Sequence, residues 1–176
     1  MAKYYTLPRV LCLLVTIVQC GFAQHPPDWI GTWKLDLERS KQAFLALGPG
    51  VTVVSQTIEF ELVDRKIKMT GATHLSDGRT SNDEDLLLSD GSDTIVSSGV
   101  ISFRRISDTA FDITVQINAN GMNATGLNHF VISLDGKILT ETKTQILREP
   151  VPQGVDPTRG KALKSSTSVL VYNRIS

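Results

Sequence analysis

The sequence predicts an all-β protein, an antiparallel up-and-down barrel of about eight to ten strands with one short helix near the N-terminus. Three observations carry this prediction. After residue 23 the chain holds 12 Val, 12 Ile and 15 Thr, and such β-branched side chains favour strands over helices. Apolar and polar residues alternate in several runs, as in Phe111 to Ile117. Asp-Gly and Asn-Gly pairs, which favour tight hairpin turns, separate these runs.

The order of strands and turns favours a meander, because a Greek-key sandwich would need longer crossovers. The predicted strands cover residues 31–37, 51–62, 66–75, 79–88, 93–98, 100–106, 111–118, 123–134, 137–147 and 166–175. Glu38–Leu47 is predicted to form the helix that covers one end of the barrel, and Gly48-Pro49-Gly50 ends it. The one long irregular connection, Glu149–Ser165, is rich in proline and cations and is predicted to be an exposed loop at a barrel end.

Residues 1–23 have the organisation of a secretory signal peptide. Lys3 and Arg9 form a positive N-terminal region, an apolar run follows, and Gly21-Phe22-Ala23 places small residues at the cleavage site. The apolar run is too short to span a bilayer, which needs roughly 20 apolar residues. We therefore expect an exported, periplasmic or secreted protein without stable membrane insertion after cleavage. Residues 24–176 are expected to form its single domain.

Composition excludes several classes of protein. Both cysteines, Cys12 and Cys20, lie in the predicted signal peptide, so the mature chain would have no disulfide, thiol nucleophile or thiolate metal ligand. The whole chain has 18 Lys+Arg and 18 Asp+Glu, a balance that excludes a polybasic nucleic-acid binder. A hydrophobic content of 41% excludes an acidic disordered tail. A domain of this size can be held together by its core.

The two ends of the domain carry a recognisable pattern. The first predicted strand opens with Gly31-Thr32-Trp33-Lys34-Leu35, and the last one carries Arg174. A Gly-x-Trp on the first strand, followed by a meander of strands, resembles the calycin superfamily, which includes lipocalins and fatty-acid-binding proteins. The resemblance implies that Trp33 closes one end of the barrel. It also implies that Gly31 lets the chain pass close to this ring and that Arg174 packs across it.

The chain is more closely similar to exported bacterial lipocalin-like proteins, most of them of unknown function. The similarity spans Trp29–Arg174 and rests on short motifs: the opening strand followed by Ser40-Lys41, then Phe103-Arg104-Arg105-Ile106, Ser133-Leu134-Asp135-Gly136-Lys137 and Val171-Tyr172. One position departs from fatty-acid-binding proteins, which hold a carboxylate with Arg-x-Tyr on the last strand. The matching triplet here is Leu170-Val171-Tyr172, and leucine cannot pair with a carboxylate. A small apolar or neutral molecule is therefore the expected ligand.

The alternating strands predict an inward-facing wall that would contact such a ligand. Its predicted members are Met69, Phe103, Ile113, Val115, Phe130, Thr142 and Tyr172. The row Thr140, Thr142 and Thr144 is small and polar, which suits a cavity better than a solid core. The alternative, in which these side chains simply fill the core, stays open.

No residue pattern predicts catalysis, a metal site or a cofactor. The histidines, His25, His74 and His129, lack metal-ligand spacing, although His74 and His129 could still meet inside a barrel. The acidic run Asp83-Glu84-Asp85, with Asp90 and Asp93, lacks the EF-hand pattern and is interpreted as a solvated hairpin tip. The sequence also contains neither a nucleophile elbow nor a phosphate-binding glycine loop.

Three functions are compatible with these features. The first is an exported binding protein that holds a small apolar or neutral molecule in the barrel interior. The second is an isomerase-like or cyclase-like enzyme, which requires His74, His129, Tyr172 or a carboxylate to converge in an apolar cavity. The third is an envelope interaction protein that uses the basic segment 159–164 or an exposed strand edge. Asn123-Ala124-Thr125 is in addition a formal glycosylation acceptor in a secreted chain.

Overall fold

The computed structural model describes residues 27–44, 50–96, 99–119, 122–152 and 155–176. The predicted signal peptide lies outside these residues. The described part forms ten strands, as the sequence predicts, and one 3₁₀ turn: β1 (Gly31–Lys41), β2 (Val53–Val63), β3 (Lys66–Leu75), β4 (Thr80–Leu88), β5 (Asp93–Val96), β6 (Gly99–Arg105), β7 (Ala110–Ala119), β8 (Met122–Ile132), β9 (Ile138–Arg148), η1 (Pro157–Arg159) and β10 (Ala162–Arg174). Only the end of β1 and the start of β10 lie far from their predicted positions.

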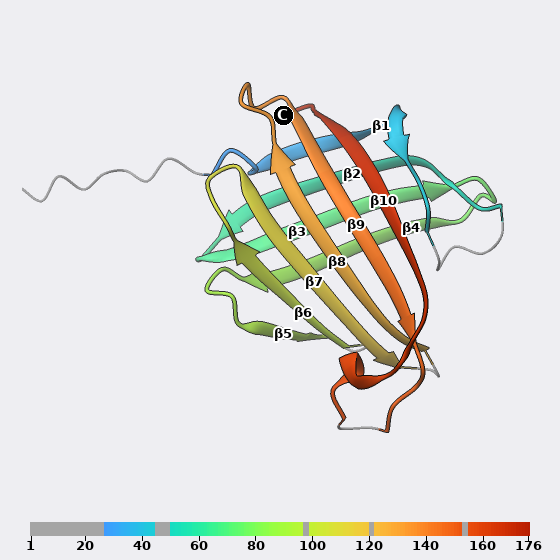
Figure 1. The fold of residues 1–176 in the computed structure, drawn as a ribbon. Coiled ribbons are helices and arrows are strands. Elements are labelled where there is room, and N and C mark those ends of the chain that lie inside the picture. The colour runs from blue at the N-terminus through green and yellow to red at the C-terminus, as the bar shows by residue number, and fades with distance from the viewer. Residues whose placement is uncertain (1–26, 45–49, 97–98, 120–121, 153–154) are drawn as a thin grey trace, which may run out of the picture.

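The strands form one antiparallel meander that nearly closes into a barrel. Their order is β4-β3-β2-β1-β10-β9-β8-β7-β6-β5, so β4 and β5 are the two edges of the sheet. Figure 1 shows β1 to β4 crossing behind β6 to β10, and these two runs form opposite walls. The edges approach each other where Thr94 Oγ1 donates to the carbonyl of Leu86 at 3.4 Å. Because β5 is only four residues long, much of β4 lies beyond its reach.

The helix predicted at Glu38–Leu47 is wrong in its described part. The first four of these residues extend β1, and residues 45–49 lie outside the described ranges. The pairing of β1 with β10 shifts beyond Asp36, which marks a β-bulge. Ser40 Oγ supports this bulge, since it accepts the backbone N–H of Val171 at 2.9 Å. Pairing with a neighbouring strand therefore overrides the local helical propensity.

Aromatic side chains fill one half of the barrel interior. Trp29 precedes β1 and contacts Phe60, Phe103 and Phe111, with ring centroids 4.9 to 6.1 Å apart. The rings of Phe111 and Phe130 stack at 4.6 Å with an interplanar angle of 9°. All five side chains are at most 3% exposed. Aromatic contacts add to the energy of apolar burial, so this half is the stability core of the domain.

Gly31, Trp33 and Arg174 close the barrel beside this core. The guanidinium carbon of Arg174 lies 5.1 Å from the centroid of the Trp33 ring, the arrangement that the calycin resemblance implies. Arg174 also donates to the carbonyls of Ile30 at 2.6 Å and Gly136 at 3.2 Å. Gly31 has a φ of +137°, and a Cβ there would lie 2.6 Å from the carbonyl oxygen of Ser176. Only glycine fits this position without strain.

The connection between β9 and β10 folds back onto the outer face of the barrel. Its 3₁₀ turn contacts β7 and β8, and Figure 1 shows this turn beside the ends of those strands. Asn123 lies beneath the connection at 2% exposure and donates to the carbonyl of Glu149 at 2.7 Å. A glycan on Asn123 would have to displace this connection, so the folded domain does not present this acceptor to solvent.

Candidate binding cavity in the barrel mouth

A cavity of about 240 Å³ lies in the half of the barrel that the aromatic core leaves free. It is lined by Phe44, Val53, Gln56, Thr73, Leu75, Ser81, Asp83, Lys143 and Gln145. These residues come from the segment after β1, from β2, β3 and β4 of one wall, and from β9 of the other. The cavity therefore lies between the two walls and opens at the end of the barrel where β2 begins and β3 ends.

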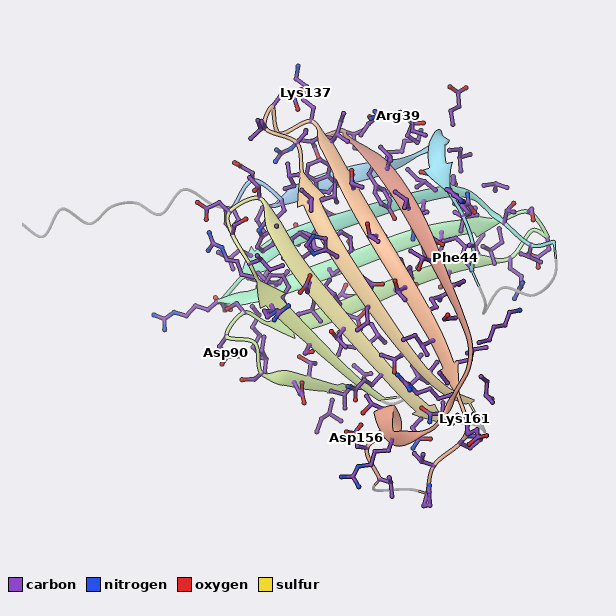
Figure 2. The ribbon with its side chains drawn as sticks, in the orientation of Figure 1. Arg39, Phe44, Asp90, Lys137, Asp156 and Lys161 are labelled. Atoms are coloured by element: carbon purple, nitrogen blue, oxygen red, sulfur yellow. The ribbon has the colours of Figure 1, made fainter. Side chains whose placement is uncertain are left out.

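The segment that follows β1 is tied across this opening. The Gln42 amide pairs with the backbone of Val53 in both directions, at 2.8 and 3.0 Å. The backbone N–H of Ala43 donates to Ser168 Oγ at 2.9 Å, which joins the segment to β10. These bonds bring the Phe44 side chain to the cavity, and Figure 2 shows Phe44 near the ends of β2, β3 and β4. The described residues of this segment thus form part of the cavity wall.

Gly71 adds open space to the interior. It lies opposite Ile58 on β2 and Asp83 on β4, so it belongs to the inward-facing row. A Cβ built on Gly71 would meet no other atom within 4 Å. Glycine weakens a strand because it has no side chain to pack. Gly71 does not itself line the cavity, but the open space at its inner face adjoins two lining residues, its register partner Asp83 and Thr73 on the same strand.

A chain of hydrogen bonds forms the boundary between the cavity and the core. Tyr172 is fully buried, and its hydroxyl lies 2.9 Å from both Glu141 Oε2 and Gln56 Oε1. The Gln56 amide in turn lies 3.2 Å from Thr73 Oγ1. Burial, followed by the charge and the hydrogen bond of Glu141, raises the pKa of Tyr172 well above its ordinary value. The phenol therefore keeps its proton at neutral pH.

The direction of this chain follows from proton counting. The Tyr172 hydroxyl has one proton and faces two acceptor atoms, so it cannot donate to both. When Glu141 is ionised, Tyr172 donates to it and the Gln56 amide turns its NH₂ toward the phenol oxygen. The oxygen of Gln56 then accepts from Thr73. Every member has a partner in this arrangement, which explains how a carboxylate only 5% exposed is accommodated.

Lys143 supplies the counter-charge at a distance. Its Nζ lies 4.0 Å from Glu141 Oε1 and 5.8 Å from the centroid of the Phe44 ring. A strong charge-assisted hydrogen bond would have a length of about 2.7–2.9 Å, so the ammonium attracts Glu141 without closing on it. Asn128 and Ser168 lie opposite Lys143 on the two neighbouring strands. This row of the interior is consequently polar.

Six of the seven residues predicted to face a ligand do point inward, but they lie on the core side of the cavity. Phe103, Ile113 and Phe130 are buried in the hydrophobic core, and Met69 and Val115 pack against it. Tyr172 reaches the cavity only through Gln56. None of the predicted ligand-facing residues lines the cavity itself.

The predicted inward position of Thr142 is wrong. Thr142 lies opposite His129 on β8 and Val169 on β10, two exposed residues of the outer face. Its row therefore faces outward, whereas Glu141, Lys143 and Gln145 face inward. Side chains alternate along a strand, so one choice of face inverts every assignment. A charged row is expected to face solvent, but Glu141 has buried partners that only the tertiary fold provides.

The outer face carries a separate polar groove of about 320 Å³. In it, His129 Nδ1 lies 2.7 Å from Asp112 Oδ1, and Arg104 donates to Asp112 Oδ2 at 2.5 Å. Burial alone raises the pKa of Asp112, but the hydrogen bonds and charges of Arg104 and His129 outweigh it and lower the pKa below its ordinary value. His74 is exposed on β3. His74 and His129 do not meet inside the barrel.

The acidic run is also placed differently from its prediction. Asp83, Glu84 and Asp85 lie within β4 rather than at a hairpin tip, and Asp83 lines the cavity. Burial and the neighbouring Asp83 raise the pKa of Asp85. Asp90 does lie in the β4–β5 turn, where it accepts the backbone N–H of Ser92 at 2.9 Å. Among the described residues, no group of three or more His, Cys, Asp or Glu could hold a metal ion.

Neither models of known protein families nor curated protein sequences give a match to this chain. The nearly closed ten-stranded barrel is compatible with a calycin-like fold, and that compatibility rests on architecture alone. Across the described ranges, no helix has the length and apolar character needed to cross a membrane. Function is therefore inferred from the cavity.

Proposed function

We propose that this protein is an exported binding protein that holds a small molecule with an apolar body and no carboxylate group in the barrel mouth. The cavity between the two walls is the observation that carries the proposal. Barrels of this size hold ligands in such mouths, with apolar walls and a few placed polar groups. Export is proposed from the pattern of residues 1–23.

The lining of the cavity supports this class of ligand. Phe44, Val53 and Leu75 provide apolar surface on one side. Gln56 and Thr73, on the same two strands as Val53 and Leu75, offer hydrogen-bonding groups. The last strand has Leu170 where fatty-acid-binding proteins have a cation, and Leu170 is buried. A carboxylate would therefore enter without the cation that holds it in that family.

The enzyme hypothesis receives less support. Its histidine candidates lie outside the cavity, and only Tyr172 and Glu141 converge. The raised pKa of Tyr172 makes its phenol a poor proton donor at neutral pH. An interaction partner would bind as an extra strand along the exposed edge of β4. The acidic run of Asp83 to Asp85 on this edge would favour a positively charged partner strand. Ligand binding remains the function with the most direct support.

Native mass spectrometry tests the proposal. The full chain would be expressed in a host that exports it, and the purified protein would be analysed before and after denaturation. We expect a small molecule that is released on unfolding, or that loads from an extract of the host envelope. An N-terminus at residue 24 in the same spectrum would support export.

A matched pair of variants locates the bound molecule. Gly71→Leu fills the hollow on the inner face of β3, whereas Ala72→Leu adds the same side chain to the outer face of the same strand. We expect loss of the adduct in Gly71→Leu and its retention in Ala72→Leu. A protein that stays empty with every extract would contradict the proposal, and so would an adduct that survives Gly71→Leu. Thr73→Leu is a second filling variant should Gly71→Leu fold poorly.

A further inference from the structure

Two charged residues line the cavity, Asp83 and Lys143, and two further carboxylates, Asp85 and Glu141, belong to the same inward-facing rows of β4 and β9. Asp83 and Asp85 on β4 and Glu141 on β9 belong to inward-facing rows, because their register partners are Gly71, Met69 and Phe130. Within the described interior near the cavity, Lys143 is the cation that faces them. The inward-facing cations Arg105, Lys164 and Arg174 lie at strand ends and are exposed. The inward-facing rows of β4 and β9 therefore hold three carboxylates and one ammonium group.

Lys143 leaves much of this negative potential available. Its Nζ lies 4.0 Å from Glu141, at the outer limit of an ion pair, and 5.8 Å from the Phe44 ring, at the outer limit of a cation–π contact. Asp83 accepts a hydrogen bond from the hydroxyl of Ser81, which lies 3.0 Å from its Oδ1 and 2.9 Å from its Oδ2. Burial, followed by the charge of the neighbouring Asp83, raises the pKa of Asp85.

An unpartnered acceptor lies in the same row. Asn128 is 9% exposed and lies directly opposite Lys143, so its side chain faces the interior. Its side-chain oxygen is buried and has no hydrogen-bond partner among the described residues. Buried polar groups are nearly always satisfied in native proteins. A hydrogen-bond donor carried by a ligand would satisfy this one.

Building on the proposed binding function, we propose that the cavity selects small molecules that carry a cationic amine on an apolar or aromatic body. The ammonium group would be attracted by Asp83 and Glu141 and would donate to Asn128. The apolar body would pack on Phe44 and Leu75. The sequence alone predicts an apolar or neutral ligand. That prediction rests on Leu170, which stands where fatty-acid-binding proteins have a cation. It takes no account of Glu141, because the alternation of β9 was assigned to the wrong face.

Three ligands with one aryl body test the charge preference: phenethylamine, phenethyl alcohol and phenylacetate. Binding to the exported full-length product would be measured by isothermal titration calorimetry. We expect the amine to bind at least about tenfold more tightly than the alcohol, and the carboxylate to bind most weakly. Glu141→Gln and Asp83→Asn should each reduce the preference for the amine over the alcohol, since each removes one negative charge.

Lys143→Met provides the opposite change. Removal of the competing ammonium should raise the affinity for phenethylamine by about tenfold or more and leave phenethyl alcohol nearly unchanged. Lys68→Met is the matched control, because Lys68 pairs with Glu84 at 3.3 Å on the outer face of the same barrel. It should leave both affinities unchanged. Added phenethylamine should also raise the melting temperature of the Lys143→Met protein. This shift can be measured even if the variant is less stable than the wild type.

The outcomes separate this inference from the proposed function. Equal or tighter binding of the alcohol or the carboxylate would overturn the amine assignment, and so would a preference that survives both Glu141→Gln and Asp83→Asn. The proposed function would still hold if the bound compound is lost in Gly71→Leu and retained in Ala72→Leu. If none of the three compounds binds, the amine assignment is wrong, and native mass spectrometry with the host extract decides the proposed function independently.

Discussion

The two halves of the barrel interior differ in packing, although they belong to one sheet. In the half beside β1's start, Trp29, Phe60, Phe111 and Phe130 are fully buried and touch ring to ring. In the other half, β2, β3 and β9 present Gln56, Thr73, Lys143 and Gln145 around a cavity. Burial of aromatic surface supplies most of the stability that one barrel end needs. The other end can then remain hollow and polar.

The boundary between these halves is narrow. Phe130 on β8 lies directly opposite Glu141 on β9, so one row of the interior passes from ring to carboxylate. Tyr172 joins both sides, since its ring packs in the core and its hydroxyl meets Glu141. A buried carboxylate is costly without partners, and the phenol supplies one. This contact makes the polar half compatible with the apolar half.

The largest expected effect is on the aromatic half. Phe111→Ala removes a fully buried ring with four aromatic neighbours, and we expect the free energy of unfolding to fall by about 3–5 kcal/mol. Leu75→Ala, in the cavity wall, should cost only about 1 kcal/mol because the side chain is half-buried and borders open space. Urea denaturation followed by tryptophan fluorescence measures both. Equal losses in the two variants would show that the halves are not energetically distinct.

Tyr172→Phe tests the boundary. The change removes a donor from Glu141 and leaves its carboxylate buried, so we expect a loss of about 1–3 kcal/mol at neutral pH. The pH dependence has a definite sign. Because the folded-state pKa of Tyr172 is raised, its stabilising effect is complete below about pH 10 and is lost as the pH rises through the folded pKa. The Phe variant should lack that alkaline decrease.

The ionisation of Tyr172 can be measured without interference from other tyrosines of the processed chain. Its three tyrosines are Tyr4, Tyr5 and Tyr172, and the first two lie in the predicted signal peptide. Tyrosinate absorbance of the processed protein therefore reports on Tyr172 alone. We expect this absorbance to appear only together with alkaline unfolding. Ionisation of Tyr172 in the folded protein near its ordinary pKa would contradict the buried Tyr172–Glu141 contact.

The fold was largely predictable from the sequence, and the site was not. Alternation in runs such as Phe111–Ile117, with turns between them, was enough to predict ten strands and a meander. The exception at Glu38–Lys41 arose from a bulge, which depends on hydrogen bonds to β10 that local sequence does not specify. The contact of Arg174 with Trp33 followed from the family resemblance.

The cavity depended on side chains whose facing is decided by long-range partners. β9 contains a threonine row and a row of Glu141, Lys143 and Gln145, and either could have faced inward on alternation alone. The register with β8 decides between them, because Phe130 lies opposite Glu141. Ile138 and Ile146 flank the threonine row, and Leu139 and Leu147 flank the Glu141 row, so the local sequence favours neither face. Phe44 lay in the segment that was assigned to a helix.

Gly71→Leu tests whether the half of the barrel that contains the cavity has unfilled interior space. The new side chain fills open interior space and replaces a glycine in a strand, so we expect stability to rise by about 0.5–1 kcal/mol. Thermal unfolding of the empty protein measures the gain. Ala72→Leu on the outer face should change stability less. A loss of more than about 1 kcal/mol in Gly71→Leu would show that the interior is already filled at this position.

The smallest expected effect lies on the outer face, which belongs to neither half. Asp112→Asn removes the charge that holds Arg104 and His129, and Arg104 is largely exposed. Exposed ion pairs contribute about 0.2–1 kcal/mol, so the loss should stay within that range. Because the pKa of Asp112 is lowered in the folded state, the contribution is present above about pH 4 and is lost as the pH falls through the folded pKa. Denaturation at neutral and acid pH therefore should separate wild type from variant only at neutral pH.

The same variant provides a control for ligand binding. The affinity of Asp112→Asn for phenethylamine should equal that of the wild type, since the outer groove and the cavity lie on opposite faces of the sheet. A changed affinity would mean that the outer row of Arg104, Asp112 and His129 takes part in ligand binding, so that the interior alone would not account for it.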